Sequence, residues 1–170
     1  MLEGALDPPH DDAAEEAVAA DSNHAPALAG LTSLCTLARL LPERDPHPNL
    51  YEVTLFVLGY LDDPEVWPAL MVRWELALLD ELGFGLDLSA CAATGTNDNL
   101  VYVSPKTGRA VSAAAGEPYK ERLLRLPPFL TKGRQGAATP EDVLAGLELT
   151  GHFLEARVLA PRGDKMPEAR

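Results

Sequence analysis

The sequence predicts a mainly α-helical fold, a bundle of about four main helices with a small β-hairpin insertion. Apolar residues recur at three- and four-residue spacing in separate segments, and prolines and glycines mark the breaks between them. A short β-branched and aromatic stretch in the middle predicts the hairpin. At 170 residues with 46% apolar side chains, the chain is long enough for one domain with its own core.

Composition divides the chain into three parts. Residues 1–26 carry seven acids, no Lys or Arg and few large apolar side chains, so we expect a flexible acidic segment. The folded domain is expected over residues 27–160, followed by a C-terminal tail over 161–170. No stretch approaches the ~18 consecutive apolar residues that cross a bilayer, and the N-terminus shows no export signal. We therefore expect no membrane contact and a cytoplasmic protein whose two cysteines stay reduced.

Two helices are expected before residue 62. The first follows Pro26 and spans residues 28–41, with apolar side chains at helical spacing until Pro42. Cys35 lies on that stripe and is expected in the core as a small hydrophobe. The second spans residues 50–61 and is apolar nearly all round, which is typical of a helix in the middle of a bundle.

The third helix is expected from Trp67 to Leu82, with Trp74 in the core. Pro68 is acceptable only near a helix start, because it lacks an N–H, and Gly83 is a natural C-terminal residue. Gly83-Phe84-Gly85 therefore indicates a helix end and turn; it follows a helix and lacks the lysine of a phosphate-binding loop.

The hairpin and the last helix follow. Residues 100–104 and 109–112 are expected to pair as strands across the turn 105–108, and residues 127–138 form a loop. Thr139 then serves as N-cap with Pro140 at the first helical position, and this helix is expected to run to Pro161.

No cluster of residues indicates catalysis. The four histidines are scattered, and none stands at ligand spacing from a second histidine, cysteine or pair of acids. His152 is expected to be a half-buried or exposed helix residue, and not a general base. We therefore predict no enzyme activity, no catalytic residue, no cofactor and no metal.

A basic region stands out in a chain of net charge −12. Residues 106–134 hold seven bases against two acids, whereas residues 27–105 hold three bases against eleven acids. The region is either a solvated surface beside the hairpin or an anion-binding face for DNA phosphates or an acidic peptide. The candidate DNA- or acidic-peptide-binding residues are Lys106, Arg109, Lys120, Arg122, Arg125, Lys132 and Arg134.

Four stretches of the chain resemble the RecO family of bacterial DNA repair proteins. They are Arg73–Gly95 (RWELALLDELGFGLDLSACAATG), Ala29–Cys35, Leu40–Glu52 and Tyr102–Gly108. In order and spacing the resemblance covers residues from about Leu28 to Leu159.

The resemblance implies a recombination mediator without catalytic turnover. Such a protein binds and anneals DNA and works with RecR and the single-stranded DNA-binding protein to load the recombinase RecA. In this pathway, the RecF pathway, the chain would act in the cytoplasm and associate with the nucleoid during repair. The family combines an N-terminal OB-fold barrel with a helical domain that carries a zinc-finger-like insertion.

The chain departs from the family pattern in two places. Where the barrel should stand there is only the acidic segment 1–26, so the chain resembles the C-terminal helical domain alone. Many relatives carry two C-x-x-C pairs, which here would fall on Cys91 and Thr94 and near Ser112 and Ala115. One thiol cannot hold a structural zinc, so the insertion near residues 91–115 is expected to be a degenerate, metal-free finger. Leu100, Tyr102 and Val111 should then hold it by packing against the helices.

Two functions follow from the sequence. In the first, the chain is a repair accessory protein that binds DNA weakly and acts through RecR and the acidic, hydrophobic-ended C-terminal tail of the single-stranded DNA-binding protein. In the second, it is a truncated helical scaffold that has lost DNA binding. An unrecognised enzyme is a third and weaker possibility.

Overall fold

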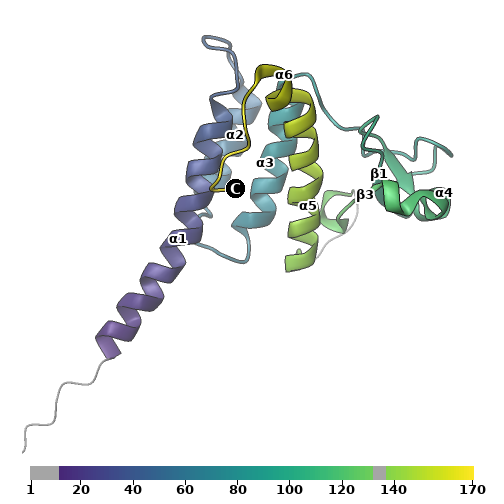
Figure 1. Cartoon of the computed structure of the whole chain (residues 1–170). Coiled ribbons are helices and arrows are strands. Elements are labelled where there is room, and N and C mark those ends of the chain that lie inside the picture. Colours follow the sequence, from purple (N-terminus) through teal and green to yellow (C-terminus); the bar gives the residue numbers. More distant parts are fainter. Residues whose placement is uncertain (1–11, 132–136) are drawn as a thin grey trace, which may run out of the picture.

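Four long helices form the body of the protein in a computed structural model that describes residues 12–131 and 137–170 (Figure 1). They are α1 (Asp12–Ala38), α2 (Pro48–Leu58), α3 (Trp67–Glu81) and α5 (Pro140–Phe153). A small sheet lies beside α5, on the side away from α1 (Figure 1). The prediction of a mainly helical fold with a small β insertion is therefore confirmed.

Helix α1 begins earlier than expected. It starts at Asp12 and continues through Pro26, and its first half projects beyond the other helices (Figure 1). Residues 12–26 are thus helical where a flexible segment was expected; their flexibility stays a prediction, and residues 1–11 lie outside the described residues. Pro26 lacks an N–H, so α1 has one backbone hydrogen bond fewer at this point.

Fewer side chains of α1 are buried than its apolar sequence predicted. Leu34 and Leu37 are buried, but Cys35 is exposed, so the prediction of a core Cys35 is wrong. Each residue turns an α-helix by about 100°, which moves Cys35 off the stripe that Leu34 occupies.

Helix α2 does not lie in the middle of the bundle. Leu50 and Val57 are its buried residues, and it packs mainly on α3. Tyr51, Leu55 and Phe56 are more than half exposed. The prediction of a central position was wrong. A sequence that is apolar all round indicates that the helix has much apolar surface, but it does not show which other elements cover that surface.

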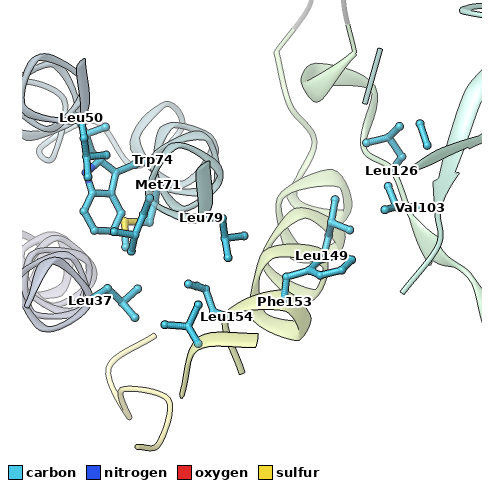
Figure 2. Close-up of a cluster of buried hydrophobic side chains, with 14 of the residues drawn as sticks. Leu37, Leu50, Met71, Trp74, Leu79, Val103, Leu126, Leu149, Phe153 and Leu154 are labelled. Carbon is cyan, nitrogen blue, oxygen red and sulfur yellow. The ribbon is translucent and has the colours of Figure 1, made fainter. Parts of the chain in front are cut away.

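Helix α3 is the centre of the core. Pro68 lies at its start and Gly83, at φ 84°, follows its C-cap, as predicted. Trp74 has no exposed surface, and its Nε1 donates to Thr54 Oγ1 of α2 at 2.8 Å. Leu37, Leu50 and Met71 lie around the indole, while Leu149 and Phe153 of α5 extend the core toward the sheet (Figure 2).

The predicted hairpin forms as β1 (Leu100–Val103) and β2 (Ala110–Ser112). A third strand, β3 (Leu124–Arg125), pairs antiparallel with β1 and was missed, because two residues carry no periodicity. Between β2 and β3 lie a four-residue helix, α4 (Ala113–Gly116), and a 3₁₀ turn, Glu117–Arg122; a second 3₁₀ turn, Pro128–Leu130, follows β3. Leu100 and Val111 are buried and Tyr102 is partly buried against the core, as expected.

Helix α5 begins where the sequence indicated. Thr139 Oγ1 accepts from the N–H of Asp142, and the Asp142 side chain accepts from the N–H of Thr139, which completes a capping box. The helix continues through a π-helical stretch, Leu154–Leu159, into α6 (Ala160–Arg162). It therefore does not end at Pro161; Gly163, at φ 75°, terminates it.

One buried charge joins the last residues to the bundle. The Glu75 carboxylate of α3 has no exposed surface and accepts from Arg170 Nε at 2.6 Å and Nη2 at 2.9 Å. Thr150 Oγ1 of α5 also donates to Glu75. The segment after α6 runs back across the bundle to make this contact (Figure 1).

We predict that Arg170→Ala lowers the free energy of unfolding in urea by about 3–5 kcal/mol, because Glu75 is left as an unpaired buried charge. Adding Glu75→Gln should recover part of that loss, since the amide keeps the shape and removes the charge. Lys165→Ala, an exposed change in the same tail, is the control and should stay within about 0.5 kcal/mol of wild type. An Arg170→Ala protein as stable as wild type would contradict the role of this pair.

Candidate nucleic-acid interface

The turn between β1 and β2 presents the first two predicted bases. Its backbone closes through Ser104 N–H to Arg109 C=O at 3.0 Å and Gly108 N–H to Ser104 C=O at 2.8 Å. Gly108 has φ 71°, and a Cβ there would lie 2.9 Å from Leu86 Cδ2, so both conformation and space require glycine. Lys106 and Arg109 are exposed on this tight turn.

The turn is fastened to the end of α5 and to the π-helical stretch that follows it. Arg157 Nη2 donates to the Lys106 carbonyl at 3.0 Å, and its guanidinium lies 4.7 Å from the centre of the Phe153 ring. His152 Nε2 lies 3.4 Å from the Pro105 carbonyl. His152 is partly buried, as predicted, and positions the turn. These contacts give Lys106 a fixed place on the surface.

Arg157 is a base that the sequence analysis missed. It stands beside Lys106 and Gly108, whose added Cβ would lie 3.7 Å from Arg157 Nη1. The cationic group at the turn is therefore Lys106, Arg109 and Arg157. The sequence shows only that Arg157 follows His152 by five residues in one predicted helix. That spacing does not indicate that both side chains contact the β1–β2 turn.

Exposed ion pairs reduce the positive charge of two predicted bases, Arg109 and Lys120. Arg109 Nε lies 3.6 Å from Asp87 Oδ2 and Lys120 Nζ lies 2.8 Å from Glu117 Oε1, and each pair is about half exposed. Hydrogen bonds from Ser89, with help from Arg109, lower the pKa of Asp87, and Glu117 raises the pKa of Lys120. Exposed pairs of this kind are weak enough for a phosphate to replace the carboxylate.

Arg125 forms an ion pair within the fold. Its Nη2 donates to Asp142 Oδ1 at 2.9 Å, and that carboxylate also caps α5. Arg125 therefore ties β3 to the start of α5. Arg122 ends the 3₁₀ turn two residues before β3 starts and is exposed, whereas Lys132 and Arg134 lie outside the described residues.

The positions expected for a zinc site meet around one thiol. Cys91 is buried, and its Sγ accepts from the backbone N–H of Ser112 at 3.2 Å. Cys91 N–H donates to Thr96 C=O at 2.7 Å, and Ala92 N–H donates to Ala110 C=O at 2.8 Å, so the loop is attached to β2 by the backbone. With one sulfur among the four positions, these residues do not fit a tetrahedral four-thiolate zinc.

Titratable groups do not converge elsewhere in the described part. His47 is not isolated, since its Nδ1 lies 2.7 Å from Glu81 Oε2 and joins the start of α2 to the end of α3. Within residues 12–131 and 137–170, no three His, Cys, Asp or Glu side chains gather as a metal site would require. Nor is any helix in those ranges long and apolar enough to span a bilayer.

Comparisons with known proteins assign most of the chain to one family. The family model described as "Recombination protein O C terminal" matches residues 24–166. The chain is similar to the DNA repair protein RecO of Methylorubrum extorquens strain PA1, with 62% identity over 149 residues, 85% of this chain and 61% of that protein. The RecO protein of Caulobacter vibrioides is 54% identical over 145 residues, 85% of this chain and 59% of that protein.

The chain thus spans about three fifths of the length of the curated relatives it matches. No solved structure gives a significant match.

Cys91 generates a pH prediction. Burial raises the pKa of its thiol, but hydrogen bonds from Ser112 and Thr94 outweigh burial and lower the pKa to about 6. The thiol of the unfolded chain titrates at ~8.5. The stability that the lowered pKa of Cys91 adds to the folded protein is therefore fully present above that pH and is lost as the pH falls toward 6. The free energy of unfolding of wild type minus that of Cys91→Ala should therefore rise from pH 6 to pH 8.5. A difference that is flat or falls over this range would contradict the lowered pKa.

Proposed function

The chain belongs to the RecO family, which it matches over that family's C-terminal domain, and we propose that it is a non-catalytic accessory protein of DNA repair and recombination. It would act in the cytoplasm at the nucleoid, with DNA and protein partners as its ligands. The observation that carries this proposal is the turn between β1 and β2, which bears Lys106 and Arg109 and is held by Arg157. We call it the basic turn.

DNA would bind across the turn and the segment that precedes β3. Lys106 and Arg157 are joined by the hydrogen bond to the Lys106 carbonyl, and Arg109 stands on the same turn. Arg122 adds an exposed base before β3, the strand that pairs with β1. Because the backbone of the turn is already held, binding of these cations costs side-chain entropy but little ordering of the backbone.

Such binding would be weak and sensitive to salt. The chain has a net charge of −12, which repels a polyanion, and three of the predicted bases already face carboxylates. Phosphate contacts act through release of counterions, so affinity falls steeply as salt rises.

We propose two protein partners from family membership. RecR is one. The other is the acidic, hydrophobic-ended tail of the single-stranded DNA-binding protein, which would use the bases that also attract DNA. Tyr119 is 61% exposed next to Lys120, which places an apolar contact beside a cation. Tail and DNA would then compete.

A specific observation favours the alternative of a scaffold that has lost DNA binding. Ion pairs occupy Arg109, Lys120 and Arg125, which leaves fewer unpaired cations on this surface for DNA. Under this alternative the basic surface is only a solvated face of the sheet.

Charge reversal separates the two functions. Lys106→Glu combined with Arg122→Glu should weaken binding of a fluorescent single-stranded oligonucleotide at least about tenfold at low salt. Removing two phosphate contacts should also reduce the slope of log affinity against log salt by about 1.4. Arg125→Glu is avoided because it would break the contact with Asp142 at the cap of α5.

Arg39→Glu combined with Lys165→Glu is the matched control. It changes net charge equally at exposed positions lining a groove between α1 and the tail. Equal losses in both double variants would indicate a purely overall charge effect. Wild-type protein without measurable affinity would support the scaffold, and tight binding that survives high salt would refute the assigned surface.

A further inference from the structure

Helix α2 carries an apolar stripe that the described structure leaves uncovered. Tyr51 is 64% exposed, Leu55 51%, Phe56 56% and Tyr60 41%. Tyr51 and Leu55 lie four residues apart on α2, as do Phe56 and Tyr60, which follows the end of the helix. At about 100° per residue the two pairs stand on either side of the exposed Glu52, and together they cover the outward half of the helix surface. The Phe56 and Tyr60 rings pack with centroids 5.0 Å apart. We name these four residues the α2 stripe.

The α2 stripe is comparable in size to the largest apolar patch that a typical monomer exposes, and such a patch often binds a partner. Its exposed side chains add up to about 400 Å², on the scale at which an apolar patch marks an interaction site. A stable dimer buries about 800 Å² on each partner, so the α2 stripe alone is too small for a second copy. It matches the contact that one amphipathic helix makes.

Charges around the α2 stripe have one sign. Residues 40–66 contain six acids and a single base, Arg44. Glu52 is exposed on α2 next to Tyr51, and Asp62 and Glu65 are exposed just beyond Tyr60. An isologous contact between two copies would bring acid against acid, and DNA or an acidic tail would be repelled.

We propose that the α2 stripe is the docking surface for a basic amphipathic helix of a partner protein. Apolar side chains of that helix would pack on Leu55 and Phe56, and flanking Lys or Arg side chains would meet Glu52 and Glu65. This surface lies on different elements from the basic turn and takes a ligand of opposite charge. The inference therefore goes beyond the proposed DNA-binding function and does not rest on it.

The test uses the full chain and two fluorescent peptide probes of about eighteen residues, helical at 1.5 Å per residue. One has leucines on one face and lysines elsewhere, and the other replaces every lysine with glutamate. The lysine peptide should bind at least about tenfold more tightly than the glutamate peptide. Phe56→Ser should weaken the lysine peptide at least about tenfold without lowering the melting temperature, because the side chain is exposed.

Leu144→Ser on α5 is the matched control for apolar exposure, since Leu144 is 62% exposed, and it should leave binding unchanged. Glu148→Gln, also on α5, is the control for Glu52→Gln, which should weaken binding by about threefold. Equal binding of the lysine peptide to wild type and Phe56→Ser would mean attraction by overall charge alone and would overturn the proposal. Equal binding of both peptides, no binding of either, or self-association abolished by Phe56→Ser would overturn it as well.

Discussion

The buried Glu75 carboxylate is the constraint on which the rest of the structure depends. A charge without exposed surface is tolerated only when it is paired and hydrogen-bonded. Glu75 lies on α3, and its two partners come from elsewhere in the chain: Thr150 from α5 and Arg170 from the tail. The requirement to satisfy one carboxylate therefore links α3, α5 and the tail, beside the apolar contacts around Trp74 and Leu149 (Figure 2).

Helix α5 connects this buried cluster to the sheet by side-chain hydrogen bonds at both of its ends. At its start Asp142 caps the helix and holds Arg125 of β3. At its far end His152, and Arg157 in the π-helical continuation, hold the carbonyls of the β1–β2 turn. The base-bearing turn is thus a surface feature supported from the core, and the loop at Cys91 is secured by hydrogen bonds to β2 and Ser112.

Local sequence signals predicted most of the helices, and long-range pairings escaped them. The caps of α3 and α5 and the two hairpin strands depend on neighbouring residues, so they were found. Glu75 and Arg170 are 95 residues apart, and no local pattern joins them. The same holds for Arg125 with Asp142 and for Arg157 with the Lys106 carbonyl, so the sequence identified bases but not which of them are neutralised. Periodicity showed that α2 is apolar all round, yet it cannot distinguish a core from a docking surface.

Amide hydrogen exchange of the full chain with and without single-stranded DNA at low salt tests the central claim most directly. That claim is that the core-supported turn and the segment before β3 form the DNA-contacting face. The account predicts that DNA slows exchange in residues 104–109 and 120–124 and leaves residues 48–60 of α2 unchanged. Slower exchange in α2 or in the tail, with the turn exchanging as in the free protein, would contradict it.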